Sequence, residues 1–485
     1  MKHKQLDKTA LHWRRTKIVA TLGPATSTAP MVEKLIKAGV NVFRLNMSHG
    51  SHQQHRDAFQ LVREIALSMS QHVAVLMDLC GPKIRTGKFK KGSISLKKNS
   101  TALIRCDITT GDEGVIASQY TQLYKDVKKG DRILLDDGNL ELRVEKVTGK
   151  TISCKVIHGG ILKDNKGINL PDSKVSVSSF TAKDKKDVKL AMELGADFVA
   201  LSFVRNGKDI LVLDSYMKKN GGQIPIIAKI EKPEAITNID SILEASYGLM
   251  IARGDLGIEL PAEQVPLIQK ELICMARERN CPVIVATQML ESMIEHSRPT
   301  RAEVGDVANA ALLGSDAVML SGETAVGKYP VLAVKMMDRV LREIEAHQWQ
   351  HNNFGGRDNQ VTNPDKISVR KAVAYAATSL AQDLKLQGII VPTASGTTAQ
   401  IIAASRPTSP LLGVSSRSHI CRKLALHWGV IPIEADENQT HDWKALSQSI
   451  SKYCHLTKTG NTVLLVSGFN EDPALNEPAM KILKV

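Results

Sequence analysis

The segment FVALSFV at residues 198–204 begins the part of the chain that decides the fold, because IPIIAKI at 224–230 follows it at a helix-sized interval. Both runs are short, apolar and rich in β-branched residues, as buried strands are, and an amphipathic segment separates them. Eight such runs occur, at residues 17–22, 41–47, 73–79, 198–204, 224–230, 249–253, 283–288 and 317–320. This alternation predicts an α/β fold, a (β/α)8 TIM barrel.

One gap between these runs is too long for a single helix. The residues between the third and fourth runs carry turn signals, such as DDGN at 136–139 and GG at 159–160, among Val, Thr and Lys. That pattern predicts a small β-barrel domain inserted at residues 88–172. The (β/α)8 domain itself is then expected at residues 1–87 and 173–345.

A further module follows the barrel. Residues 348–364 are polar, with Asn, Gly, Asp and Pro, and they are typical of a linker. Strand-like runs then occur at residues 388–392, 411–414, 430–433, 462–466 and 480–484. They predict a C-terminal α/β domain at residues 346–485. Because this domain has no carboxylate cluster comparable with that of the barrel, we expect it to serve regulation or assembly.

Composition excludes several classes of protein. Hydrophobic residues make up 43% of the 485 residues and charged residues 24%, values that are ordinary for globular domains. No apolar run approaches the ~18 residues that span a bilayer, and the basic N-terminus lacks the apolar core of a secretory signal. Seven scattered cysteines without a C-x-x-C pair indicate reduced thiols and a cytoplasmic protein. The net charge of +14 suits anionic ligands, but the 4% aromatic content and the absence of a finger or RNP motif disfavour nucleic-acid binding.

Polar side chains gather at the ends of the predicted strands. In a (β/α)8 barrel these ends meet at one rim, where active sites lie. The residues concerned are Arg44, Asn46, Ser48 and His49; Asp78; Ser202 and Arg205; Lys229 and Glu231; Arg253 and Asp255; Thr287 and Gln288; Ser321 and Glu323. The alternative is that each is a helix N-cap or a solvated loop residue, which suits Ser48 or Ser321 taken singly. The repeated placement of charged residues favours a site.

Lys229, Glu231 and Asp255 have the chemistry of a metal-assisted phosphate site. Lys229 and Glu231 share one face of a strand, since side chains alternate with period two. A plain ion pair is the alternative. Asp255 ends the next strand, and two carboxylates are the usual protein share of a Mg²⁺ site. The nearby cations imply an anionic, phosphorylated ligand. Gly254 and Gly257 would let backbone N–H groups approach a carboxylate, unless they only serve a tight turn.

Two nucleotide-binding motifs are excluded. Residues 322–329, GETAVGKY, match G-x-x-x-x-G-K, but Tyr329 stands where a P-loop needs Ser or Thr for Mg²⁺. No G-x-G-x-x-G follows a predicted strand, which argues against a Rossmann oxidoreductase.

Nearly the whole chain resembles the pyruvate kinases. The resemblance rests on TKIVATLGP (16–24), NVFRLNMSHG (41–50), IAKIE (227–231), MIARGDLG (250–257), ATQML (286–290) and MLSGETA (319–325). It implies a (β/α)8 domain, an inserted lid and a C-terminal effector domain. It also implies phosphoryl transfer from phosphoenolpyruvate to ADP, giving pyruvate and ATP in the last step of glycolysis.

The resemblance assigns a role to each matched residue. Lys229 would neutralise the transferring phosphoryl group and the enolate, Arg44 would clamp the phosphate, and Glu231 and Asp255 would hold Mg²⁺, for which Mn²⁺ is a substitute. Thr287 and the Gly254 backbone would grip the carboxylate of phosphoenolpyruvate. Thr287 and Ser321 are both candidates for delivering a proton through water. The nucleotide would contact Asn46, His49, Arg85 and Lys183, and a second Mg²⁺ would arrive with ADP.

The segment DLCGPKIRTG at 78–87 departs from the family pattern. Members that need K⁺ usually have Thr and Glu where this chain has Leu79 and Lys83, although the K⁺-ligand positions Asn46, Ser48 and Asp78 are kept. A fixed ammonium from Lys83 would supply the charge that K⁺ otherwise brings. We therefore expect a branch that does not require K⁺. An exposed loop lysine without a role is the alternative.

A hydroxyl-rich loop in the C-terminal domain, TASGTTA at 393–399, follows a strand and opens a helix. Its Thr393, Ser395, Gly396, Thr397 and Thr398 resemble the loop that holds a phosphorylated activator in many pyruvate kinases, and N-capping is the alternative. The resemblance also implies a homotetramer.

Two other functions stay open at this point. One is a Mg²⁺-dependent (β/α)8 lyase or aldolase acting on pyruvate or phosphoenolpyruvate, and the other is a basic nucleic-acid binder. The lyase has no use for the insertion or for Arg85, and steep salt dependence of duplex binding would mark the second.

Overall fold

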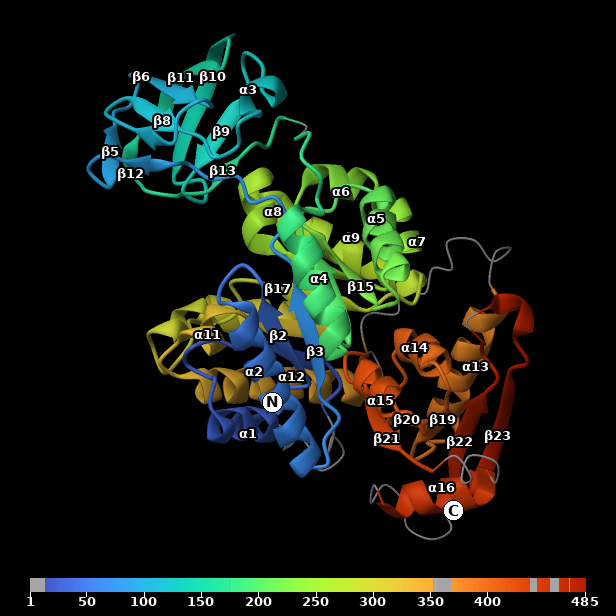
Figure 1. The fold of residues 1–485 in the computed structure, drawn as a ribbon. Coiled ribbons are helices and arrows are strands. Elements are labelled where there is room, and N and C mark those ends of the chain that lie inside the picture. Colours follow the sequence, from blue (N-terminus) through green and yellow to red (C-terminus); the bar gives the residue numbers. More distant parts are fainter. Residues whose placement is uncertain are drawn as a thin grey trace.

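Eight parallel strands close a barrel at the centre of the molecule (Figure 1). The computed structural model describes residues 14–173, 175–351, 354, 368–436, 443–453, 462–470 and 472–485. The barrel strands are β1 (Lys17–Thr21), β2 (Val42–Asn46), β3 (Ala74–Asp78), β14 (Phe198–Leu201), β15 (Ile226–Ile230), β16 (Gly248–Ala252), β17 (Val283–Ala286) and β18 (Ala317–Leu320). They pair in chain order, and β1 bonds to β18 to close the ring. The predicted (β/α)8 fold is confirmed.

Helices cover the outside of the barrel. They are α1 (Ala29–Ala38), α2 (His52–Ser68), α4 (Ala182–Leu194), α5 (Gly207–Lys219), α6 (Pro233–Thr237), α7 (Ile239–Ala245), α8 (Arg253–Glu259), α9 (Val265–Glu278), α10 (Arg301–Leu312), α11 (Gly322–Ala325) and α12 (Pro330–Gln350), with short 3-10 turns η2 (Ala262–Gln264) and η3 (Glu291–Ile294). Capping boxes at Ser51, Thr181 and Thr300 start α2, α4 and α10. Each box satisfies backbone N–H groups that the first helical turn leaves without a partner.

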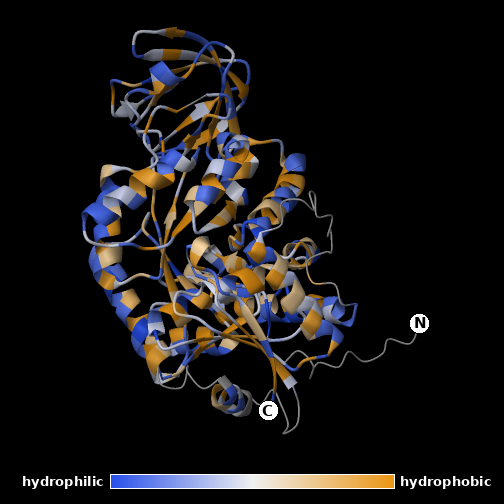
Figure 2. Ribbon diagram, turned by 90° about the vertical axis from the view of Figure 1, so that its right-hand side faces the viewer, coloured by the Kyte–Doolittle hydropathy of each residue, from blue (hydrophilic) through white to orange (hydrophobic). Residues whose placement is uncertain are grey.

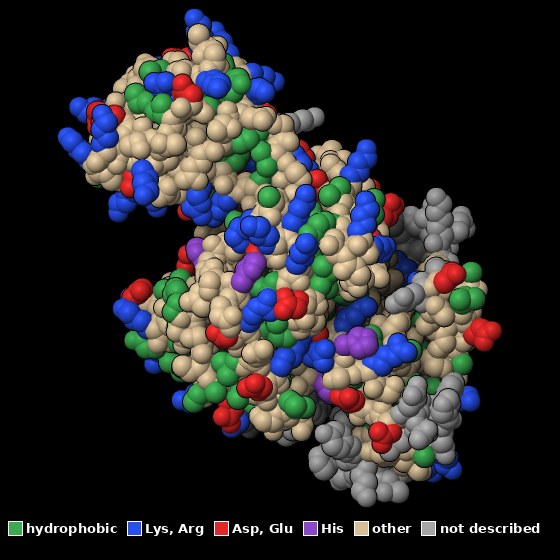
Figure 3. Space-filling model, in the orientation of Figure 1, with side chains coloured by type: hydrophobic (Ala, Val, Ile, Leu, Met, Phe, Trp, Pro, Cys, Tyr) green, Lys and Arg blue, Asp and Glu red, His purple; other side chains and the backbone are tan. Residues whose placement is uncertain are grey.

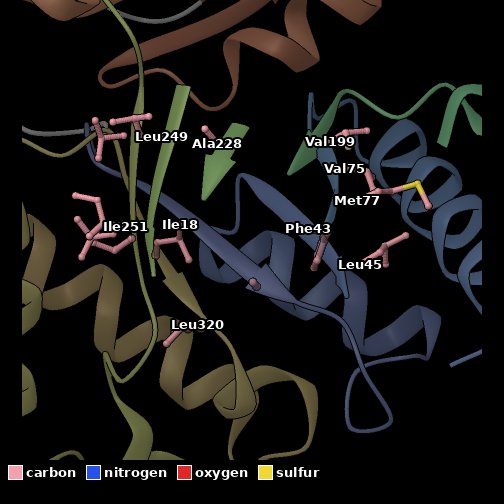
Figure 4. Close-up of a cluster of buried hydrophobic side chains, with 14 of the residues drawn as sticks. Ile18, Phe43, Leu45, Val75, Met77, Val199, Ala228, Leu249, Ile251 and Leu320 are labelled. Atoms are coloured by element: carbon pink, nitrogen blue, oxygen red, sulfur yellow. The ribbon is translucent and has the colours of Figure 1, made fainter. Parts of the chain in front are cut away.

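The barrel strands bury both of their faces. Phe43 and Met77 belong to the outer cluster between strands and helices, part of which Figure 4 shows. Val19 and Leu76 belong to a second cluster that fills the interior. In Figure 2 the strands are accordingly orange, whereas the surrounding helices mix blue and orange. Burial on both faces explains why these strands are continuous apolar runs without alternation.

The insertion between β3 and α4 forms a separate β unit at the top of Figure 1. Its elements are β4 (Lys88–Phe89), β5 (Ser93–Leu96), β6 (Thr101–Arg105), β7 (Thr110–Gly111), β8 (Val115–Ala117), α3 (Leu123–Asp126), β9 (Arg132–Leu135), β10 (Leu140–Thr148), β11 (Thr151–His158), β12 (Gly160–Lys163) and β13 (Ile168–Asn169). Six strands pair in the order β13-β9-β10-β11-β6-β8, and two strand pairs flank them. They enclose a core of their own. Lys and Arg side chains are spread over the face seen in Figure 3.

The C-terminal domain is an α/β sheet, as predicted. Its order is β21-β20-β19-β22-β23, and only the edge strand β23 runs antiparallel among the described strands of this sheet. The elements are α13 (Val369–Asp383), β19 (Ile389–Pro392), α14 (Thr397–Ala404), β20 (Leu411–Ser415), α15 (Ser418–Leu424), β21 (Val430–Glu434), α16 (Trp443–Tyr453), β22 (Thr462–Ser467), η6 (Pro473–Leu475) and β23 (Ala479–Lys484). Most of the predicted linker at 348–364 lies outside the described residues.

The C-terminal domain closes the floor of the barrel, the end away from the candidate site. Leu426, which follows α15, is fully buried and joins the interior cluster of the barrel. Beside it, Arg406 pairs with Asp316 at 2.9 Å, and both side chains are buried. Tyr247 and His427 share a hydrogen bond of 2.5 Å. The two domains are therefore joined by one continuous buried contact.

The sequence analysis expected no membrane-spanning segment and no disulfide bonds. In the described part of the chain, no helix is long and apolar enough to cross a membrane. Six cysteines, at 80, 106, 154, 274, 281 and 421, are free thiols. Cys454 lies outside the described residues.

Candidate active site

Four charged side chains meet where β2, β3 and β15 end. Arg44 contacts Asp78 Oδ2 at 2.6 Å, and Lys229 Nζ lies 3.4 Å from Asp78 Oδ1 and 2.8 Å from Glu231 Oε1. The barrel register explains this meeting, because Asn46 is opposite Asp78 and Arg44 opposite Leu76 on neighbouring strands. Period-two alternation then sets Lys229 and Glu231 on the same face of the chain. These four residues, the charged cluster, are almost wholly buried.

The carboxylates of the cluster keep Lys229 charged. Burial alone would lower the pKa of Lys229, but the carboxylates of Asp78 and Glu231 raise it above its ordinary value. Lys229 is therefore an ammonium at neutral pH. Burial raises the pKa of Glu231, and the Asp255 carboxylate raises it further, against the opposite effect of Lys229. Asp255 is therefore near enough to Glu231 for the two carboxylates to repel each other.

The pair of carboxylates fits a divalent cation. Asp255 lies in the first turn of α8 and lines a cavity with Lys83 and Phe203, between the barrel and the insertion. Burial and the neighbouring Asp255 carboxylate raise the pKa of Glu231, and a bound cation would stabilise the charged form of that carboxylate. No group of three or more His, Cys, Asp or Glu in the described residues forms a complete metal site. Water and substrate oxygens would complete the coordination, as is usual for Mg²⁺.

Backbone strain at the end of β14 supports the cluster, and the sequence analysis did not foresee it. Phe203 has a φ of 54°, and its N–H donates to Glu231 Oε2 at 2.7 Å. Lys229 Nζ donates to Ser202 Oγ at 2.9 Å, and Ser202 donates to the Leu79 carbonyl at 2.7 Å. A large residue seldom adopts a positive φ, so the surroundings must hold it there. The run FVALSFV gave no sign of this bend, because its hydrophobicity continues through it.

Thr287 and Gly254 are brought together across the ends of β16 and β17. The Gly254 N–H donates to Thr287 Oγ1 at 2.7 Å. Thr287 and Gln288 both have positive φ, 66° and 53°. Arg253 donates to the Thr287 carbonyl at 2.6 Å and pairs with Asp306 at 2.5 Å. Arg253 thus holds the strained backbone of Thr287 and Gln288 in place.

Ser321 follows β18. Its Oγ is buried, and no partner for it exists among the described residues. The Ser321 N–H donates to Glu323 Oε2 at 2.7 Å. Ser321 occupies the N-cap position of α11 without a side-chain capping bond, so the N-cap interpretation of its hydroxyl is wrong. Burial raises the pKa of Glu323.

The four residues expected to contact a nucleotide do not form one cluster, and none of them is among the residues that line the cavity. Lys183 donates to the Met47 carbonyl and to Asp187, both at 2.6 Å. Arg85 donates to the Asn165 carbonyl in the insertion at 2.9 Å. His49 is exposed, and Asn46 Oδ1 accepts from the Ser48 N–H at 3.1 Å.

Lys83 is exposed and lines the same cavity as Asp255. Within the described residues its side chain makes no hydrogen bond or ion pair. Asp78 was expected at the barrel rim and at a position matching a monovalent-cation ligand; in the structure its carboxylate pairs with Arg44 and Lys229, as described above.

The loop before α14 is folded on itself. Thr393 Oγ1 accepts from the Gly396 N–H at 2.9 Å, and Ser395 and Thr397 share a hydrogen bond of 2.8 Å. Thr398 is buried and donates to the Phe469 carbonyl at 3.4 Å. Gly396 has a φ of 90°, which a residue with a Cβ rarely adopts. Lys423 donates to the Ser395 carbonyl, so a cation lies beside the loop.

A second buried ionic contact lies at the rim, and the sequence analysis missed it. Lys232 pairs with Glu259 at 2.5 Å, and Asn169 from the insertion donates to the same carboxylate at 3.1 Å. The only available signals were that Lys232 follows Glu231 and that Glu259 lies four residues after Asp255. Neither signal identifies Asn169.

Family models match most of the chain. "Pyruvate kinase, barrel domain" covers residues 13–334, and "Pyruvate kinase, alpha/beta domain" covers residues 371–483.

Individual proteins match over nearly the full length as well. Pyruvate kinase 2 of Synechocystis sp. is 42% identical over 97% of this chain and 79% of its own length. The pyruvate kinase of Mycobacterium tuberculosis is 41% identical over 94% of this chain and 95% of its own. The crystal structure of a pyruvate kinase from Cryptosporidium parvum superposes with a TM-score of 0.90 at 35% identity, covering 99% of this chain and 98% of that one.

Proposed function

Because the chain belongs to the pyruvate kinase family and is therefore a phosphotransferase, we propose that its charged cluster transfers the phosphoryl group of phosphoenolpyruvate to ADP, giving pyruvate and ATP. The observation that carries the proposal is the meeting of Arg44, Asp78, Lys229 and Glu231 at the carboxyl ends of three barrel strands. The relatives do not favour the lyase alternative, which needs neither ADP nor an insertion.

Each member of the cluster has a proposed task. Lys229 neutralises the phosphoryl group in flight and the enolate that remains. Arg44, held by Asp78, clamps the phosphate. An ammonium about 4 Å from such an oxygen is worth ~4 kcal/mol at an effective dielectric near 20, and this stabilisation accelerates the reaction when it is greatest in the transition state.

The family generally uses Mg²⁺, and Glu231 and Asp255 would hold it here, with Mn²⁺ as a substitute. When bound, the ion polarises substrate oxygens. The Phe203 N–H fixes one Glu231 oxygen, so the carboxylate is oriented before the ion arrives. Thr287 and the Gly254 backbone are proposed to orient the carboxylate of phosphoenolpyruvate. The buried, unpartnered Ser321 hydroxyl can hold a water that protonates the enolate.

We further propose that Asn46, His49, Arg85 and Lys183 contact ADP. Arg85 bonds to the insertion and Lys183 to the end of β2, so the insertion and the barrel would both contribute to nucleotide binding.

The reaction is tested by measuring pyruvate formation from phosphoenolpyruvate with and without ADP in the presence of Mg²⁺. Pyruvate that appears only with ADP, together with equimolar ATP, supports the phosphotransferase. Pyruvate that appears at the same rate without ADP contradicts it and favours a lyase or phosphatase.

Independence from K⁺ is a separate proposal. It is supported by the exposed ammonium of Lys83, which lines the cavity that Asp255 also lines. We expect full turnover in K⁺-free buffer, with tetramethylammonium as the only monovalent cation. Lys83→Glu should make turnover depend on added K⁺, and the exposed Lys186→Glu serves as the matched control. Strong activation of the unaltered protein by K⁺ would contradict the proposal.

The C-terminal loop is proposed to bind a phosphorylated activator through Thr393, Ser395, Gly396, Thr397 and Thr398. Its hydroxyls and the neighbouring Lys423 are donors suited to phosphate oxygens. The corresponding assay titrates sugar phosphates against the phosphoenolpyruvate saturation curve. The homotetramer that the family resemblance implies is checked by light scattering.

A further inference from the structure

The insertion touches the barrel at α8, the helix that carries Asp255. Asn169, on the last strand of the insertion, donates its side-chain N–H to Glu259 Oε1 at 3.1 Å. Glu259 is the last residue of α8. A Cβ placed at Gly138 would lie 3.6 Å from Ile258 Cγ2, so a turn of the insertion also lies against the end of this helix.

Glu259 is a buried charge with few partners. Its side chain is 1% exposed, and Lys232, 12% exposed, pairs with its Oε1 at 2.5 Å. The same oxygen accepts the Asn169 bond, while Oε2 is buried without a partner among the described residues. A buried carboxylate that lacks hydrogen bonds is costly. Among the residues that the structure describes, the Asn169 amide therefore supplies one of the two polar contacts to this carboxylate.

Both barrel members of the contact sit next to the carboxylates assigned to the metal. Lys232 directly follows Glu231, and Glu259 lies four residues after Asp255, on the same face of α8. Asn169, Lys232 and Asp255 also line one cavity. Making or breaking the contact at Glu259 therefore affects α8, the helix that positions Asp255.

We propose that Asn169, Glu259 and Lys232 form a latch, which closes the insertion over the site and thereby positions Glu231 and Asp255. This inference rests on the proposed function of those carboxylates, and it makes Asn169 a positioning residue. When the insertion moves away, water replaces the Asn169 amide at Glu259, so the contact can be broken and remade in every catalytic cycle. A modest, reversible bond of this kind sets the closed fraction and hence the apparent affinity for substrates.

The test compares Asn169→Ala, Asn169→Asp and the control Gln122→Ala, an exposed amide elsewhere in the insertion. For Asn169→Ala we expect KM for ADP to rise about tenfold with kcat within about twofold, since saturating substrate restores closure. Asn169→Asp should be worse than Asn169→Ala, because it keeps the size of the side chain but replaces the donor with a second carboxylate. A packing role would give the opposite order.

A binding measurement gives a readout besides turnover. Mn²⁺ binding followed by electron paramagnetic resonance should weaken in Asn169→Ala and stay unchanged in Gln122→Ala. Hydrogen exchange of the protein without ligands should quicken in α8 and β13 of Asn169→Ala. In a double-mutant cycle with Glu259→Gln, the two substitutions should be non-additive.

The outcomes separate the latch from the reaction. If the unaltered protein forms pyruvate but Asn169→Ala matches Gln122→Ala in KM and in hydrogen exchange, the latch is refuted and the proposed function stands. If the unaltered protein forms no pyruvate, the proposed function fails, and hydrogen exchange alone then decides for or against the latch. Additive effects in the cycle would likewise refute the contact.

Discussion

At the scale of single residues, Asp78 organises the candidate site. One of its oxygens accepts from Arg44 and the other faces Lys229, so one buried carboxylate aligns two cations that are proposed to meet the same phosphoryl group. The sequence placed this carboxylate at the barrel rim and at a position matching a monovalent-cation ligand, without a partner. Its second relation, to Lys229, depends on β3 and β15 both lying beside β14 in the barrel, which the sequence of either strand cannot reveal.

The first prediction concerns Lys229. Lys229→Met should lower kcat/KM by about three powers of ten, since it removes a charge worth ~4 kcal/mol next to the transferring group. Steady-state pyruvate formation measures the loss, and far-UV circular dichroism should show unchanged secondary structure. The exposed Lys186→Met should behave like the unaltered protein. Near-normal turnover of Lys229→Met would refute its role.

At the scale of secondary-structure elements, the strand ends matter most. The eight runs located every barrel strand, because burial on both faces leaves a continuous apolar signature. The ends were less predictable. Residues 283–288 were expected in one strand, yet β17 ends at Ala286, since Thr287 and Gln288 turn into the left-handed region. Similarly, β14 ends at Leu201, before the bend at Phe203. The hydrophobicity of a segment indicates which residues are buried. It does not indicate where the backbone leaves the strand conformation and redirects its N–H groups.

The hydrogen bond between the Gly254 N–H of α8 and Thr287, which follows β17, yields a prediction at this scale. Thr287→Val keeps the shape of the side chain but removes the acceptor of the half-buried Gly254 N–H, and a donor that loses its partner without access to water costs up to about 1–3 kcal/mol. We expect kcat/KM for phosphoenolpyruvate to fall at least about tenfold, by the same free-energy scale. Thr287→Ser, which retains the hydroxyl, is the control and should lose much less. Equal losses in the two variants would show that the methyl group matters and the hydrogen bond does not.

At the scale of the whole molecule, the interface between barrel and C-terminal domain contains buried ionisable groups. Burial lowers the pKa of His427 to about 3 and that of Lys17 to about 7. Around His427 lie Asp316, which favours the charged imidazole, and the cations of Lys423, Arg406 and Lys17, which oppose it. The separate domains could be predicted from the sequence, but this shared floor could not, because it joins residues hundreds of positions apart.

The interface should loosen in acid. Between pH 6.5 and 3 the unfolded chain binds a proton at His427 that the folded protein excludes, so stability is lost as pH falls, by up to about 1.4 kcal/mol per pH unit. Lys17, whose pKa in the folded protein is about 7, is largely protonated in both states over this range and adds little to the slope. His427→Gln should therefore lose less thermal stability than the unaltered protein between pH 6.5 and 4. The melting temperature across this range measures it, with the exposed His158→Gln as control. Parallel melting curves for all three proteins would contradict the prediction.

Leu426, which belongs to the C-terminal domain, fills the end of the barrel opposite the candidate site. Its side chain completes the hydrophobic interior formed by Phe198, Met250 and Met319. A chain that ended after α12 would expose the apolar interior of the barrel to solvent at the end opposite the candidate site. Replacing the C-terminal domain with an unrelated one would thus require more than a compatible linker, because the new domain must also supply an apolar side chain that fills the end of the barrel.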